Sequence, residues 1–351
     1  MIIFSFAFIF IIGMLAFSNG FSYKPGEVSK EKGLRSPLSP PSQEGVKPNF
    51  WKVEEDIFLY YFSAGKGIPV LIIHGGPGLP PSKPWKGLEE LKGSFKFYFY
   101  HQRGCGKSTR PVDRFESKNF LQNFAYLDNV LGISAQLADI ERIRRILKLD
   151  KVIIIGHSYG GFLATLYAVE FPEHVEKMVV ITPAGVLKMP VEEGGIDQLK
   201  DYLPEDMKSE YENFLSRYFN YGNIFLKSEK ELAELNSEFV KFFGAALKTK
   251  GIELPEDSET DAENIGGWMV HAMYLSLGLK YDLRNELKKV DAPVLVVHGE
   301  KDVMLPSVSK EYADLFVNGE FKAVSKASHF PFSENPEEFD GIISDFLKKD
   351  R

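Results

Sequence analysis

Short runs of consecutive apolar residues alternate with longer amphipathic segments along much of the chain. Wholly apolar runs are typical of strands in a parallel sheet that helices cover on both faces. Such runs lie at 70–73, 152–155, 178–181 and 293–297. Apolar residues spaced three or four apart predict helices at 133–149, 162–171, 308–316 and 336–349. This alternation predicts an α/β fold built on a mostly parallel sheet flanked by helices.

Other parts of the chain depart from this rhythm. Runs at 50–53 and 57–62 predict a hairpin, and those at 95–100 and 321–324 predict two further strands. Residues 186–283 are rich in aromatic and acidic residues with helical spacing, and they lack a Val/Ile-rich run. We therefore expect one core domain, formed by 49–185 and 284–351, that is interrupted by a helical cap at 186–283.

The first residues read as a targeting segment followed by a linker. Residues 1–17 are almost wholly apolar and carry no charged side chain. This composition predicts a signal peptide or an N-terminal membrane anchor at 1–18, and hence a protein that is exported (periplasmic or extracellular) or tethered to a membrane. Residues 19–48 are rich in Pro, Ser, Gly, Lys and Glu, so we expect a disordered linker there.

Composition excludes several classes of function. The chain of 351 residues has a net charge of −7 and no basic stripe, so a nucleic-acid partner is not expected. Cys105 is the only cysteine, which rules out an internal disulfide and a zinc–thiolate cluster. The seven histidines lack the H-E-x-x-H spacing of a zinc helix, so no metal site is expected.

A candidate nucleophile lies in the motif Gly156-His157-Ser158-Tyr159-Gly160. This G-x-S-x-G pattern follows a predicted strand directly and precedes a predicted helix, which is the context that a nucleophile elbow requires. The flanking glycines allow strand and helix to approach each other closely. We predict that Ser158 is the nucleophile of a serine hydrolase with an α/β-hydrolase fold.

An activated serine needs a base and an acid that orients the base. In this fold the chain order is Ser, acid, His. The loop after the last predicted strand contains His329, which we expect to be the base. The loop after the strand at 293–297 contains Asp302, the expected acid, and Glu300, its rival.

The oxyanion of the reaction needs two amide donors. The backbone N–H of Tyr159 follows the nucleophile and is the first expected donor. The second is expected from the glycine-rich loop His74-Gly75-Gly76-Pro77-Gly78, with Gly76 as the donor.

The chain resembles the proline iminopeptidase family of α/β-hydrolases. The resemblance rests on three motifs: His74-Gly75-Gly76-Pro77-Gly78, Gln102-Arg103-Gly104-Cys105-Gly106-Lys107-Ser108 and Gly156-His157-Ser158-Tyr159-Gly160-Gly161. It implies a Ser-His-Asp triad, a helical cap over the site and no cofactor. It also marks Gln102 and Arg103, with the glycine-rich loop, as supporting residues.

Two departures from the family pattern concern the substrate. His101 stands where the family has Asp before Gln-Arg-Gly. The family reads the free amino group of its substrate with cap glutamates, one of them near a Trp, but no carboxylate stands beside Trp268 in Gly267-Trp268-Met269-Val270-His271. Trp268 and His271 are the candidate pocket residues.

Three hypotheses for the function follow. The first is a proline iminopeptidase-like aminopeptidase that acts on short peptides, which the motifs favour. The second is a carboxylesterase for small apolar acyl esters, which the aromatic cap favours. The third is an inactive binding module, and the complete set of catalytic residue types argues against it.

Overall fold

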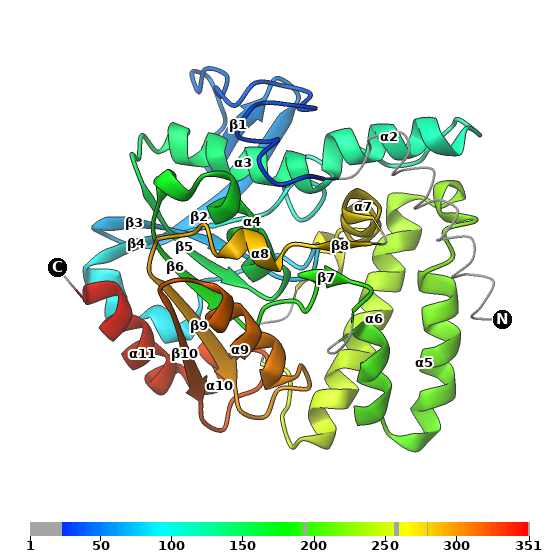
Figure 1. Ribbon diagram of the computed structural model, residues 1–351. Helices are drawn as coiled ribbons and strands as arrows, with labels where there is room; N and C mark the ends of the chain where they lie inside the picture. Colours follow the sequence, from blue (N-terminus) through cyan, green and yellow to red (C-terminus); the bar gives the residue numbers. More distant parts are fainter. Residues whose placement is uncertain (1–22, 192–194, 256–259, 279, 350–351) are drawn as a thin grey trace.

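The computed structural model describes residues 23–191, 195–255, 260–278 and 280–349. Its centre is an eight-stranded sheet with the order β1-β2-β4-β3-β5-β6-β9-β10 (Figure 1). The strands are β1 (Phe50–Glu54), β2 (Ile57–Gly65), β3 (Ile68–Ile73), β4 (Phe95–Tyr100), β5 (Val152–His157), β6 (Val175–Ile181), β9 (Val294–Gly299) and β10 (Gly319–Val324). β1 and β2 form the expected hairpin and β2 joins β4 antiparallel, whereas every pairing from β4 to β10 is parallel.

The strand order reverses at β3, which pairs with β4 on one side and with β5 on the other. A parallel sheet opens a crevice at such a point, beyond the carboxyl ends of its strands. The glycine-rich loop at 74–78 follows β3 and the G-x-S-x-G motif ends β5. The two motifs therefore meet at this crevice.

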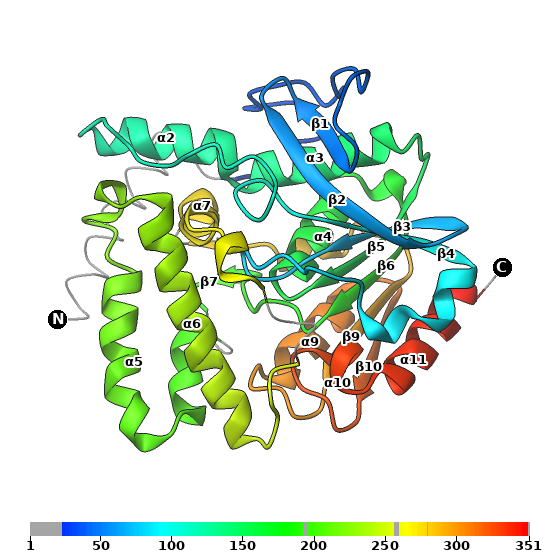
Figure 2. The same ribbon diagram turned by 180° about the vertical axis from the view of Figure 1, so that it is seen from behind.

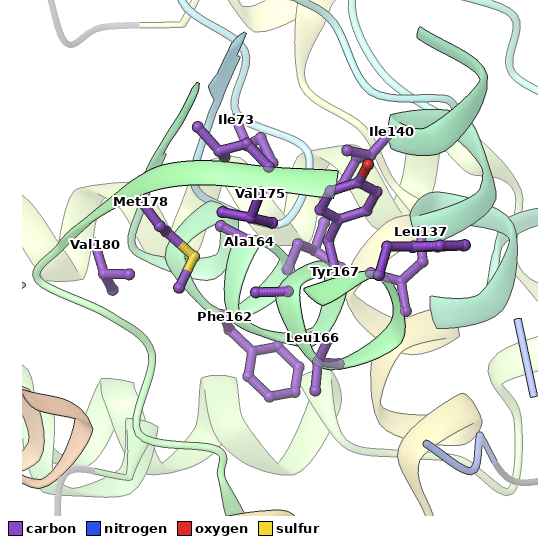
Figure 3. Close-up of a cluster of buried hydrophobic side chains, with 14 of the residues drawn as sticks. Ile73, Leu137, Ile140, Phe162, Ala164, Leu166, Tyr167, Val175, Met178 and Val180 are labelled. Carbon is purple, nitrogen blue, oxygen red and sulfur yellow. The ribbon is translucent and has the colours of Figure 1, made fainter. Parts of the chain in front are cut away.

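Helices cover both faces of the sheet, as its apolar strands require. On one face lie α3 (Ile133–Ile146), α4 (Tyr159–Glu170), α8 (Arg284–Leu287) and α9 (Pro306–Leu315). Figure 3 shows part of this face, where Tyr167 of α4 lies beside Ile140 of α3, and Phe162 of α4 belongs to the same buried cluster as Met178 of β6. The other face is covered by α10 (Pro331–Glu334), α11 (Pro336–Lys348) and short helical turns at 86–93.

A group of helices stands beside the carboxyl edge of the sheet (Figures 1 and 2). It comprises a 3₁₀ segment (Ile196–Tyr202), α5 (Glu205–Tyr218), α6 (Glu229–Thr249) and α7 (Trp268–Leu277). Two short strands, β7 (Lys188–Met189) and β8 (Tyr281–Asp282), pair antiparallel at the two ends of this insert. α2 (Phe120–Leu131) packs into the same hydrophobic cluster through Phe124 and Leu127, so a helix outside 186–283 also builds the cap.

The expectation of a disordered linker at 19–48 is wrong for residues 23–48, and residues 19–22 and the segment 1–18 lie outside the described residues. Val28 and Leu38 are buried in the main hydrophobic cluster. The Glu170 carboxylate accepts hydrogen bonds from Tyr23 Oη at 3.0 Å, Gly26 N at 2.8 Å and Ser29 N at 3.0 Å. The composition of this arm wrongly predicted disorder, because a buried side chain of the core accepts hydrogen bonds from its irregular backbone. In the described residues no helix is long and apolar enough to cross a membrane.

Glu170→Ala is expected to loosen this arm. The change removes the carboxylate that accepts three hydrogen bonds and leaves the buried Tyr23 hydroxyl unpaired, which should lower the free energy of unfolding by about 2–4 kcal/mol. Urea denaturation measures the shift. Glu173→Ala, an exposed neighbour, is the control and should change stability by less than about 0.5 kcal/mol. Equal losses in both variants would show that the arm contributes nothing through Glu170.

Candidate active site

Ser158 occupies a sharp turn between β5 and α4. Its backbone lies at φ 53° and ψ −120°, a conformation that L-residues rarely adopt. The flanking glycines are sterically required, because a Cβ on Gly156 would lie 2.3 Å from Gly160 O and a Cβ on Gly160 would lie 2.1 Å from Ile73 O. The turn leaves Ser158 half-buried on the wall of a cavity.

His329 and Asp302 come together from neighbouring loops at the same edge of the sheet. Asp302 follows β9 and His329 follows β10. Both are buried, and His329 Nδ1 lies 2.9 Å from Asp302 Oδ2. The other carboxylate oxygen accepts a hydrogen bond from Met304 N at 3.0 Å, which fixes the carboxylate plane. His329 lines the same cavity as Ser158.

The rival acid Glu300 lies two residues before Asp302, but its side chain is exposed. Its backbone N–H bonds to Val324 O at 3.1 Å, which holds the turn after β9 against the end of β10. The bond to the imidazole is therefore made by Asp302.

The loop after β3 lies against the nucleophile. A Cβ on Gly75 would stand 3.0 Å from Ser158 Cβ, so the serine and this loop are in direct contact. Gly76 has φ +115° and is followed by a cis peptide bond to Pro77. Gly78 touches the cap, since Gly266 N donates to its carbonyl oxygen at 2.8 Å.

His74 and Gln102 hold this loop in place. His74 Nδ1 donates to Gly75 O at 2.8 Å, and Nε2 accepts from Gln102 N at 3.1 Å. Gln102 Nε2 returns a bond to His74 O at 2.8 Å. Burial lowers the pKa of His74 to about 3, so the imidazole stays neutral and keeps both roles.

Arg103 lies away from the cavity and braces the scaffold. Its guanidinium is completely buried and binds both oxygens of Asp139 on α3 and one oxygen of Glu54 on β1. Despite its burial, Glu54 is ionised, because Arg103 and its neighbours hold its pKa at about 2. Arg103 thus ties the loop after β4 to two distant elements.

His157 was missed as a functional residue, although it occupies the variable position of the G-x-S-x-G motif. Its Nε2 donates to His329 O at 2.8 Å. Burial holds the pKa of His157 well below its usual value, so the ring stays neutral. The residue next to Ser158 therefore anchors the loop that carries His329.

Trp268 and His271 are not pocket residues, contrary to the prediction. Both side chains are completely buried and neither lines the cavity. Trp268 Nε1 donates to Asp113 O, and His271 packs against the rings of Tyr218 and Tyr221. The same helix faces the cavity with other residues, Val270, Met273 and Tyr274.

A carboxylate from α6 does lie beside Trp268, but it caps a helix instead of facing the cavity. Glu229 accepts bonds from Gly267 N and Trp268 N, both at 2.8 Å, and pairs with Arg110 at 3.0 Å. Its two oxygens thereby cap the start of α7. Glu229 is buried and does not line the cavity.

The cavity between the sheet edge and the cap has a volume of about 1160 Å³. Ser158, Gly75, Gly76, Tyr159 and His329 lie on its core side. Aromatic and aliphatic side chains of α5, α6 and α7 form its cap side. Over the described ranges, no group of three or more His, Cys, Asp or Glu side chains is arranged to hold a metal ion.

Comparison with known proteins agrees with this architecture. A family model described as alpha/beta hydrolase fold matches residues 68–336. Among solved structures, VinJ superposes with a TM-score of 0.59 at 18% identity, covering 88% of this chain and 99% of that one. A thermophilic esterase from Thermogutta terrifontis has a TM-score of 0.52 at 21% identity over 84% of this chain and 94% of that one. These two structures support the fold.

Curated relatives carry the name that the motifs suggested. A proline iminopeptidase of Heyndrickxia coagulans is 27% identical over 307 residues, which are 86% of this chain and 96% of that protein. One of Saccharolobus solfataricus is 24% identical over 302 residues, or 82% and 87% of the two chains. The resemblance read from the three motifs is thereby confirmed.

Proposed function

Since the chain belongs to the alpha/beta hydrolase fold family and is a hydrolase, we propose that it is a serine hydrolase that works through an acyl-enzyme on Ser158. One observation carries the proposal. Ser158, in a strained conformation at the strand–helix turn, lines the same cavity as His329. Asp302 accepts a hydrogen bond from Nδ1 of that histidine.

The proposed reaction begins with proton transfer from Ser158 to His329 Nε2. Because His329 Nδ1–H donates a hydrogen bond to Asp302, Nε2 is the nitrogen free to accept the proton. Ser158 Oγ then attacks the substrate carbonyl carbon. His329 returns the proton to the leaving group. It then takes a proton from a water molecule that attacks the ester carbonyl, and it delivers this proton to Ser158 Oγ as the acyl group leaves as a carboxylic acid.

The oxyanion would be held by the backbone amides of Tyr159 and Gly76. Tyr159 is the first residue of α4, where amides have no acceptor within the helix and the helix dipole favours negative charge. The loop carrying Gly76 contacts the serine through the neighbouring Gly75. Each such donor is typically worth about 2.7–4 kcal/mol in the transition state.

For the substrate, the leading candidate is the N-terminal bond of a short peptide, as in a proline iminopeptidase-like aminopeptidase. The curated relatives and the three motifs support it. A carboxylesterase is the second candidate, favoured by the cavity. The only described Asp and Glu side chains that line it, Asp197 and Glu212, are exposed, and Glu212 pairs with Lys200.

A substrate panel separates the two candidates. Prolyl and other aminoacyl naphthylamides are offered beside p-nitrophenyl esters, and kcat/KM is measured for each. An aminopeptidase should favour the naphthylamides and lose activity when their amino group is acetylated. Turnover of esters alone would remove the peptidase candidate and leave the serine hydrolase in place.

For the location of the protein, we propose that residues 1–18 direct its export or tether it to a membrane. Sequencing the N-terminus of protein from its native host tests this. A start near Ser18 would indicate a cleaved signal peptide. An intact Met1 on membrane-bound protein would indicate an anchor. An intact Met1 on freely soluble protein would contradict both expectations.

A further inference from the structure

The cavity beside Ser158 is larger than an aminoacyl substrate needs. Its volume is about 1160 Å³, whereas pockets that enclose a drug-sized ligand span about 300–1000 Å³. A prolyl group would fill only a small part of this space.

The charged residues of the cavity wall lie where water reaches them. Apart from histidines, the described lining residues with charged side chains are all exposed: Asp197, Glu212, Lys241 and Lys280. They mark the rim. The interior can therefore accept an apolar group without leaving a buried charge unpaired.

Two polar side chains on the inner wall, Tyr218 and Asn236, bond to the protein itself. Tyr218 Oη donates to Asn236 Oδ1 at 2.7 Å, and Asn236 Nδ2 donates to the carbonyl oxygens of Gly266 and Gly267. These groups are committed to joining α5 and α6 to the start of α7. A substrate would meet their apolar surfaces.

An apolar row on α6 leads from the catalytic histidine into the cap. Phe243 lies against His329, with ring centroids 5.1 Å apart. Phe239, one turn earlier, lies 6.0 Å from Phe243, and Val240 adjoins it on the same wall. All three are only partly buried and line the cavity.

From this geometry we infer that the enzyme takes substrates with a long apolar chain, of about eight carbons or more, seated along α6 between His329 and α5. The inference rests on the proposed serine hydrolase and names its substrate class. The chain belongs to the acyl group or to the leaving group, and the two arms of the test distinguish these sources.

The test measures kcat/KM along two series: p-nitrophenyl esters from acetyl to dodecanoyl, and alkyl acetates from methyl to octyl. Burial of one methylene is worth up to about fourfold. We expect a rise of about 100-fold or more from acetyl to octanoyl, or from methyl to octyl acetate. The series that rises identifies the side of the substrate that carries the chain.

Filling the cavity should weaken this preference for long chains. Val240→Phe adds a ring to the α6 wall and is expected to lower kcat/KM for the longest good substrate about tenfold or more, while the shortest member changes less than about twofold. Glu234→Phe places the same residue on the exposed face of α6 and should leave both values unchanged.

Flat or falling activity with chain length in both series would overturn the inference, and so would equal losses on short and long substrates in a Val240→Phe protein that melts like the parent. Turnover of short esters alone leaves the serine hydrolase standing. Failure to hydrolyse any ester or naphthylamide would remove both proposals together.

Discussion

Ser158→Ala is expected to lower kcat by about 10⁴- to 10⁶-fold on every substrate that the protein turns over. The change removes the oxygen proposed to attack, and the amide donors alone would then provide only the residual catalysis seen in serine hydrolases without their nucleophile. Alanine keeps the Cβ, so the turn at φ 53° is no more strained than before. The thermal midpoint should therefore stay close to that of the parent.

The matched control is Ser237→Ala, because Ser237 lines the same cavity from α6. It should retain at least half of the parent kcat. Steady-state kinetics on purified proteins, with active-site titration to exclude traces of parent enzyme, give the comparison. Normal turnover by Ser158→Ala would refute the mechanism.

Asp302→Asn is expected to lower kcat by about 10⁴-fold. Asn can still accept the bond from Met304 N, so the loop should keep its shape. An amide that donates to His329 Nδ1 would leave the proton on Nε2, and the imidazole could no longer act as a base. Removing this acid therefore disables the base without displacing it.

Glu300→Gln tests which of the two candidate acids, Asp302 or Glu300, supports catalysis. Its side chain is exposed and its backbone bond to Val324 O survives the change, so kcat should vary by less than about twofold. Identical losses in the Asn and Gln variants would assign the effect to the loop rather than to the Asp302–His329 bond.

Much of the fold could be predicted because burial on both faces makes strands such as β5 and β6 continuous apolar runs. The ordered arm at 23–48 could not be predicted, because its backbone is held by hydrogen bonds to Glu170 and Arg142, which are remote in sequence. α2 was also missed. Its packing against the cap depends on where the chain places α7, which local periodicity does not encode.

The candidate site divides in the same way. Chain order and local motif were enough to predict Ser158, Asp302 and His329 as the candidate residues, since each follows a strand. Trp268 and His271 were misjudged because sequence does not reveal which side of α7 faces the cavity. The size of the cavity depends on how α5, α6 and α7 are spaced, and no single segment carries that information.

The most direct test of the central claim is the site of covalent labelling by a fluorophosphonate, which reacts with activated serine hydroxyls. Intact-mass spectrometry should show one adduct per chain, with parallel loss of activity, and peptide mapping should place it on Ser158. The Ser158→Ala protein should take up none. An adduct on another serine, or inactivation without an adduct on Ser158, would contradict the proposed nucleophile.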